Sequence, residues 1–188
     1  MLGTPAAPVL HTPRLTLRGW GPGDFEPYSA MLADPETARF ITRRGRPSSE
    51  AESWAETAFF VGHWQLLGYG IFVVEEQASG AFVGRVGPLQ PKGWPRFEIA
   101  WALAPAARGK GYALEAARAA ADWAFRRFAP PRIVSIIDPR NAASRRVAER
   151  LGERRTAELF APFADDCEVW ELSRAEWAPS QPRYRERE

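Results

Sequence analysis

The first part of the chain alternates between a strand pattern and a helix pattern. Polar and apolar residues alternate over residues 14–18, which predicts a half-buried strand. Asp24 can cap the short helix that follows, because Phe25, Tyr28 and Leu32 recur at helical spacing behind it. We expect this helix to end near residues 34–35, where a proline follows an aspartate.

Residues 49–67 predict a longer helix. Ser49 and Glu52 have the spacing of a capping box, and Gly68 can end the helix. The apolar face is expected to contain residues at positions i, i+4 and i+7: Trp54, Ala58 and Val61.

Three strand-like runs follow, at residues 69–75, 81–89 and 96–104. The connections between them are short, which predicts an antiparallel meander. Residues 112–128 then predict an amphipathic helix, with a polar stripe formed by Glu115, Arg118, Asp122 and Arg126.

The last part of the chain contains a buried strand, a helix and two further strands. The continuous apolar run at 133–137 predicts a strand buried on both faces. Asn141 opens a helix that Gly152 closes, and the two further strands are expected at 154–160 and 167–173.

One domain is expected, over residues 14–178. Residues 1–13 hold three prolines and little periodicity, which predicts a loose lead-in. Residues 179–188 are charged and interrupted by proline, which predicts a disordered tail.

Composition restricts the possible functions. The chain has 188 residues, 45% of them hydrophobic, which fits one globular domain. The net charge of +2 gives no support for a nucleic-acid partner, and no run is long enough for a membrane span. A single cysteine, Cys167, excludes an internal disulfide and a cysteine metal cluster. His11 and His63 lack neighbouring ligands at metal spacing, so we expect no metal site in a cytoplasmic protein.

The segment RGKGYA, residues 108–113, lies in the turn of a predicted β-α-β unit. A crossover through a helix makes the two strands parallel, so this turn lies at the carboxyl end of the first strand. Gly109 and Gly111 allow the backbone to approach a ligand, and the start of the helix offers free N–H groups. Arg108 and Lys110 add positive charge. The segment therefore predicts an anion site for phosphate, although two glycines can also serve only a tight turn.

Two common phosphate motifs do not fit this segment. A Walker A loop requires Ser or Thr after the lysine, where Gly111 stands. A dinucleotide fingerprint requires a third glycine, where Leu114 stands.

RGKGYA does match the Q/R-x-x-G-x-G/A segment of the GNAT superfamily of acetyltransferases. Residues 11–41 resemble the opening of its RimJ/RimL-like branch, FEIAWALAPAARGKGYALEA resembles its central strand, loop and helix, and NAASRRVAERLG resembles its next helix. The resemblance implies an α/β (α+β) fold: a mixed, mostly antiparallel sheet with a parallel, splayed strand pair, flanked by helices.

The resemblance also implies acetyl-CoA as the co-substrate. In this family the backbone of the loop holds the pyrophosphate, the strand before it pairs with the pantetheine arm, and the cap of the next helix contacts CoA or an ordered water. The corresponding residues are Arg108, Gly109, Lys110, Gly111, Tyr112 and Ala113 for the pyrophosphate, Leu103 for the arm and Asn141 for the cap.

Two residues match catalytic positions of the family. Glu98 corresponds to the general base, which usually acts through water; the alternative is a carboxylate on the solvent face of a strand. Ser144 corresponds to the proposed donor of a proton to the CoA sulfur; the alternative is a local hydrogen bond in the first helical turn. Many members use a tyrosine as this acid, but no tyrosine stands between Tyr112 and Tyr184.

The leading hypothesis is an N-acetyltransferase that moves an acetyl group directly to a primary amine in a ternary complex. The acceptor would be a protein N-terminus or a small amine, and the protein a monomer or a homodimer. The alternative is a catalytically silent CoA-binding regulatory module. A nucleic-acid-binding role would rest on the arginines of 43–46 and 145–155, which are more typical of solvated faces.

Overall fold

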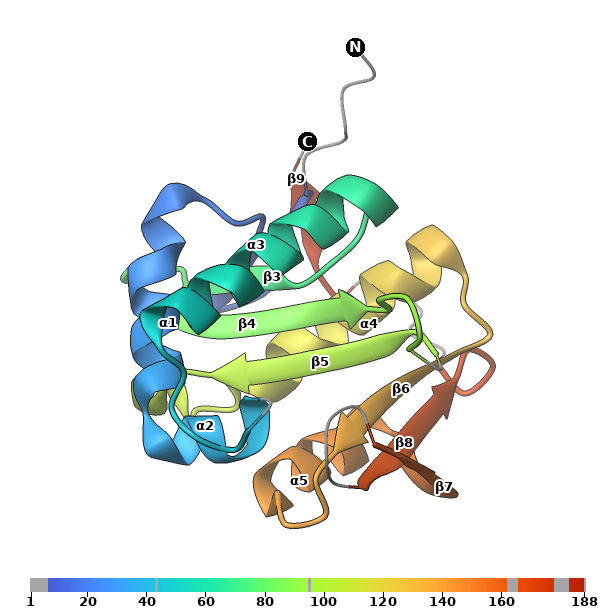
Figure 1. Ribbon diagram of the computed structural model, residues 1–188. Helices are drawn as coiled ribbons and strands as arrows, with labels where there is room; N and C mark the ends of the chain where they lie inside the picture. The colour runs from blue at the N-terminus through green and yellow to red at the C-terminus, as the bar shows by residue number, and fades with distance from the viewer. Residues whose placement is uncertain (1–6, 43, 95, 162–165, 178–182, 188) are drawn as a thin grey trace.

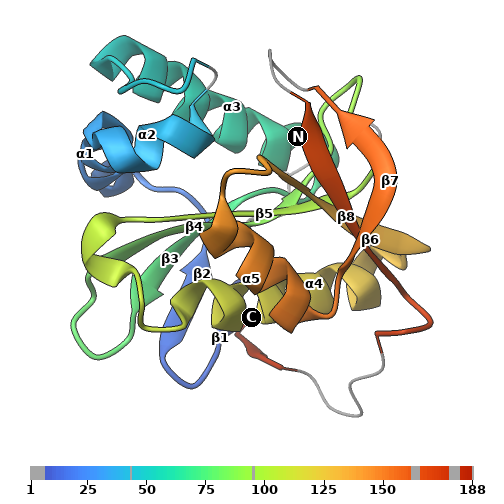
Figure 2. The ribbon, with the colours of Figure 1, turned by 90° about the horizontal axis from the view of Figure 1, so that it is seen from below.

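A computed structural model describes residues 7–42, 44–94, 96–161, 166–177 and 183–187. Nine strands of these residues form one sheet, in the order β7-β8-β6-β5-β4-β3-β2-β1-β9. The sheet is the middle layer of the molecule, with helices on both faces (Figures 1 and 2).

The larger part of the sheet is antiparallel throughout. Each neighbouring pair in it runs in opposite directions, as the sequence predicts for the meander. Its strands are β1 (Val9–His11), β2 (Leu15–Arg18), β3 (Phe72–Glu76), β4 (Phe82–Leu89) and β5 (Glu98–Leu103).

The smaller part of the sheet contains β6 (Arg132–Ile137), β7 (Arg154–Phe160) and β8 (Cys167–Ser173), again antiparallel. It joins the larger part through the parallel pair β5–β6, in which the one register pair among the described residues is Glu98 with Val134. Beyond this pair the two strands diverge (Figure 1). The mixed sheet with one parallel pair and flanking helices confirms the predicted fold class.

The helices are divided between the two faces of the sheet (Figure 2). One face carries α1 (Phe25–Ala33), α2 (Pro35–Ile41) and α3 (Glu50–Leu67). The other face carries α4 (Tyr112–Phe128) and α5 (Ala142–Leu151). Two short 3-10 turns, Pro22–Asp24 and Pro105–Ala107, precede α1 and α4.

The two faces of β5 contact different cores. Ile99 belongs to the core under α4, with Leu103 packed against it. Ala100 and Ala102 belong to the smaller core of Tyr28 and Phe60 under α1–α3. Because side chains alternate along a strand, Glu98 shares the face of these two alanines.

The expected apolar face of the helix at 49–67 is wrong. Trp54 is 62% exposed, whereas Ser53, Thr57 and His63 of α3 are buried. Thr57 donates to the Ser53 carbonyl, and His63 Nδ1 lies 2.8 Å from the Tyr69 carbonyl oxygen, whereas the buried Ser53 hydroxyl has no hydrogen-bond partner among the described residues. Phe60 and Trp64 are buried on the same side as these polar residues, so packing against the rest of the fold selects this side of α3.

Both ends of the chain differ from the expectation of unstructured segments. Residues 9–11 form β1, and residues 185–187 form β9 (Arg185–Arg187), which pairs with β1. Residues 1–6, 178–182 and 188 of the expected lead-in and tail lie outside the described residues.

Asp122 of α4 explains why the tail returns to the sheet. Its carboxylate accepts hydrogen bonds from the Trp177 indole at 3.2 Å and from the Arg183 amide at 3.0 Å. Asp122 is 1% exposed, so it does not belong to a solvent-facing polar stripe as its spacing predicts. Among the described helices, none has the length and apolar character needed to span a membrane.

Candidate active site

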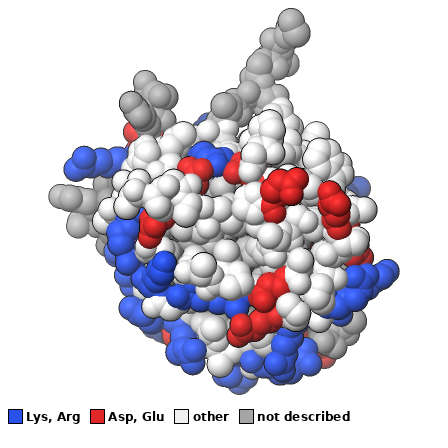
Figure 3. Space-filling view, turned by 90° about the vertical axis from the view of Figure 1, so that its left-hand side faces the viewer, with Lys and Arg blue, Asp and Glu red and all other residues white. Residues whose placement is uncertain are grey.

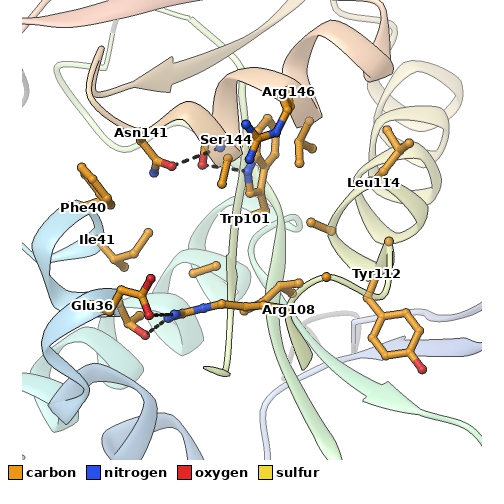
Figure 4. A pocket seen from close by; sticks show the side chains of 18 of the residues that line it. Glu36, Phe40, Ile41, Trp101, Arg108, Tyr112, Leu114, Asn141, Ser144 and Arg146 are labelled. Carbon is orange, nitrogen blue, oxygen red and sulfur yellow. Dashed lines mark hydrogen bonds and ion pairs between the residues drawn. The ribbon is translucent and has the colours of Figure 1, made fainter. Parts of the chain in front are cut away.

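A cavity of about 390 Å³ opens where β5 and β6 diverge. Its walls come from α2, the end of β5, the start of α4 and one side of α5 (Figure 4). The lining includes Leu103 on β5 and both Asn141 and Ser144 at the start of α5. The end of β5 therefore borders the same cavity as the RGKGYA segment, whereas Glu98 at the start of β5 is not among the described residues that line it.

The glycines of the segment have the backbone conformation that the predicted anion site requires. Gly109 and Gly111 have φ angles of +77° and +81°, which side chains disfavour. The first bond of α4 runs from the Glu115 amide to the Gly111 carbonyl, at 3.2 Å. The amides of the preceding turn have no partner within the helix and carry the positive end of its dipole.

Arg14 supports this loop from behind. Its guanidinium donates to the Lys110 carbonyl at 3.0 Å and to the Glu115 carboxylate at 2.7 Å. Thr12 donates to the same carboxylate at 2.7 Å. The turn between β1 and β2 thus fixes the loop in place before any ligand binds.

The side chains of the RGKGYA segment do not supply the mobile positive charge that the sequence predicts. Arg108 crosses the cavity mouth to Glu36 at 2.8 Å and Asp34 at 3.2 Å, so its charge is already neutralised (Figure 4). Lys110 is absent from the described lining of the cavity, and the Tyr112 hydroxyl donates to Glu76. The anion site consequently depends on backbone amides more than on these side chains.

Two arginines of α5 that the sequence reasoning missed do line the cavity. Arg146 and Arg150 lie on the same side of the helix as Ala143 and Val147. That helical spacing, placed after the Asn141 cap, is the sequence feature that could have identified them.

Asn141 and Ser144 lie together, as predicted. The Asn141 side chain accepts a hydrogen bond from the Ser144 amide at 3.1 Å, which confirms its structural role as the cap of α5. The Ser144 hydroxyl oxygen lies 3.3 Å from the indole nitrogen of Trp101 (Figure 4). Because the indole can only donate, the serine keeps its own proton available for another acceptor.

Glu98 is buried rather than solvent-facing, which contradicts the alternative of a solvated strand residue. It is 7% exposed, and burial raises the pKa of its carboxyl group to about 7. The Trp94 indole, the Arg85 guanidinium and the Ile136 amide act in the opposite direction on this pKa, because each favours the charged form. A carboxyl group with this pKa can accept and release a proton near neutral pH.

A second buried carboxyl group lies on the other side of the strand split. The Glu153 carboxyl oxygen is 2.9 Å from the Ser135 hydroxyl, which itself lies 2.9 Å from the Ile99 carbonyl. Burial raises the pKa of Glu153 well above its ordinary value, and the charge of Glu98 adds to the effect. A protonated Glu153 can donate to Ser135, which can then donate to Ile99 across the diverging strands.

Replacing Glu153 with glutamine is expected to preserve the hydrogen bonds from residue 153 to Ser135 and from Ser135 to Ile99, because the amide group also donates. In the wild type the folded pKa exceeds the unfolded value of about 4.3, so stability falls as pH rises above that value. Denaturant unfolding between pH 4 and 9 should show a smaller loss of stability for Glu153→Gln than for the wild type. Parallel pH dependences would contradict a buried, protonated Glu153.

Comparisons with known proteins agree with this geometry. Residues 14–154 match the model of the acetyltransferase (GNAT) domain family. The match covers most of the chain, and the chain therefore belongs to the GNAT acetyltransferase family.

Individual acetyltransferases and related proteins resemble this chain over different shares of their length. An acetyltransferase structure from Agrobacterium tumefaciens is 32% identical, with a TM-score of 0.79, 90% of this chain covered and 96% of the other. The FsC-acetyl coenzyme A-N(2)-transacetylase of Aspergillus fumigatus is 30% identical over 96% of this chain and 84% of its own length. YkkB of Bacillus subtilis is 39% identical over 45% of this chain, but the match spans only 52% of YkkB.

Members of this family use acetyl-CoA, and the residues present fit that molecule. The left-handed Gly109 has no atom within 4 Å of the position that a Cβ would take, so the loop is open toward a ligand. Leu103 pairs with Gly84 on one edge, while its other edge lies beyond the last described β5–β6 pair. An extended chain ending in a diphosphate suits this combination of a free strand edge and a helix start.

Proposed function

We propose that this protein transfers the acetyl group of acetyl-CoA to a primary amine, directly and within a ternary complex. The observation that carries the proposal is the position of Glu98: a buried carboxyl group beside the point where β5 and β6 separate. In this proposal the amides of residues 108–113 hold the diphosphate, Leu103 pairs with the pantetheine arm, and acetyl-CoA supplies the reactive thioester.

Glu98 removes the proton that blocks attack by the amine. An amine with a pKa near 8 is mostly protonated at neutral pH, so a base of similar strength is needed. The amine nitrogen then forms its bond to the acetyl carbon as the carbon–sulfur bond breaks. Ser144 gives its hydroxyl proton to the departing sulfur and takes up the proton that the newly acylated nitrogen releases, so that the amide, the thiol and the serine all end neutral. This is the role that a tyrosine has in many members of the family.

The acceptor is a protein N-terminus or a small amine. The resemblance to the RimJ/RimL-like branch supports the first, and the Aspergillus fumigatus relative, named as an N(2)-transacetylase, supports the second. Acidic and basic side chains are interspersed on the face seen in Figure 3, so no single charge sign dominates it. We further propose a cytoplasmic monomer or homodimer.

Turnover is tested by incubating the protein with acetyl-CoA and a panel of amines that includes N-terminal peptides and polyamines. Release of free thiol that depends on an amine is the expected result. Because the family's tyrosine is missing, a catalytically silent CoA-binding module is the alternative function. CoA binding without turnover on any acceptor would favour that alternative.

Arg146 and Arg150 are proposed to contact the phosphorylated ribose of CoA, because both line the cavity that holds the diphosphate loop. Both side chains are exposed, so each contact is worth little: replacing either with glutamine should weaken CoA binding by about three- to tenfold. Binding of 3′-dephospho-CoA, measured by calorimetry, should change much less. Equal losses for both ligands would contradict a contact to the 3′-phosphate.

A further inference from the structure

The split sheet is bridged on the side of Glu98 by the connection between β4 and β5. Trp94 in this connection packs edge-on against Phe160 of β7, with ring centroids 5.2 Å apart. Arg96 forms two hydrogen bonds with Glu158 of β7, at 2.6 and 3.0 Å. We call these two contacts the bridge, since they join the larger and smaller parts of the sheet.

The same tryptophan also contacts the catalytic candidate. The Trp94 indole donates a hydrogen bond of 2.5 Å to the Glu98 carboxylate. The Trp94 indole therefore contacts Glu98 through its N–H group and β7 through its packing against Phe160. The sheet fixes the backbone of Glu98, which pairs with Leu89 and Val134, but the orientation of its carboxylate depends on side-chain contacts.

We propose that Trp94 is the positioning residue of Glu98, and that the bridge through Phe160 and Arg96–Glu158 sets the orientation of Glu98 relative to the strand split. This inference rests on the proposed function, in which Glu98 is the general base. Trp94 acts through Glu98 and does not itself exchange a proton with the amine.

Other charged and titratable groups also face Glu98, so Trp94 is one of several groups that influence the Glu98 carboxylate. Arg85 approaches from β4, where it also contacts Tyr28 at 3.1 Å and Glu56 at 3.4 Å. Glu153 acts from the far side of the split. His63 of α3 accepts a hydrogen bond from the backbone amide of Gln90 at 3.3 Å. Gln90 directly follows Leu89, the β4 residue that pairs with Glu98. These groups are unchanged when Trp94 is replaced.

The first test is Trp94→Phe, which keeps an aromatic ring at this position but removes the indole N–H together with the five-membered ring that carries it. Because that N–H favours the charged carboxylate, its loss should move the acid limb of the kcat/KM profile upward by about one pH unit. Trp177→Phe is the matched control, since the Trp177 indole donates to Asp122 on the opposite face of the sheet. An unmoved acid limb in Trp94→Phe would overturn the proposal.

A second test follows Glu98 without any turnover. Carboxyl carbon NMR of glutamate-labelled protein, with the Glu98 signal assigned from Glu98→Gln, should show the same upward shift in Trp94→Phe. If the signal titrates identically in both proteins, the positioning role fails while the proposed function stands. If Glu98→Gln keeps full turnover, the proposed function fails, whatever the NMR titration shows.

The bridge is tested by reversing its ion pair. Arg96→Glu should lower kcat several-fold, because like charges then face each other across the split. The double variant Arg96→Glu with Glu158→Arg should recover most of that loss. Failure of the reversal to restore kcat, in a protein that folds normally, would show that the bridge does not act through this pair.

Discussion

Replacing Glu98 with glutamine is expected to lower kcat by about 10²–10⁴, the range that a general base contributes. The amide has nearly the same shape but cannot accept a proton. CoA affinity should stay at the wild-type value, because the diphosphate loop lies at the other end of β5. Steady-state kinetics together with calorimetry on the same preparations measure the two effects separately.

The pH profile strengthens this test. The wild-type rate should rise with pH and level off above about 7, since Glu98 has to be ionised and burial raises its pKa to about 7. The acid limb assigned to Glu98 should be absent from Glu98→Gln. Glu153→Gln removes the other buried carboxyl group and serves as the control, with kcat expected near that of the wild type. Undiminished turnover in Glu98→Gln would exclude Glu98 as the base.

Replacing Gly111 with valine should weaken CoA binding by about one to two orders of magnitude. Gly111 has a φ of +81°, and a branched side chain held in this conformation costs about 1–3 kcal/mol. The loop can relieve that strain only by turning its amides away from the diphosphate. The added side chain also approaches Arg14, whose Nη2 lies 3.6 Å from the new Cβ, and Arg14 supports the loop.

Gly68→Val is the matched control for this prediction. Gly68 has a φ of +73°, so valine suffers a similar strain, and no neighbouring atom lies within 4 Å of its Cβ position. It ends α3, next to Tyr69, which packs on Phe128 at the far end of α4 from the loop. Both variants should lose thermal stability, but only Gly111→Val should lose CoA affinity in calorimetry. Equal affinities would show that the loop does not hold the diphosphate.

Prediction from the sequence was most successful for features that neighbouring residues determine. The meander of β3, β4 and β5 follows from three strand-like runs and the short turns between them, which are local features. The Asn141 cap and the Ser49 capping box were likewise predicted and are present in the structure. Such features depend on residues a few positions apart and so require no knowledge of the fold.

Periodicity failed where distant segments of the chain decide burial. Asp122 has the spacing of an exposed residue, but the returning C-terminal segment covers it with Trp177 and Arg183. Trp54 has the spacing of a core residue but lies on the outside of α3. In both places the choice depends on contacts between residues far apart in the sequence, which spacing does not encode.

The sequence by itself determined the glycines of the diphosphate loop, the helix that follows them and the presence of a carboxylate early in β5. These features depend on backbone conformation and local order along the chain. Only the tertiary structure decided that Glu98 is buried and contacts Trp94, and that Arg108 is already paired with α2. Burial, electrostatics and the width of the strand split arise from elements that pack together from distant parts of the chain, and these quantities set the chemistry of the site.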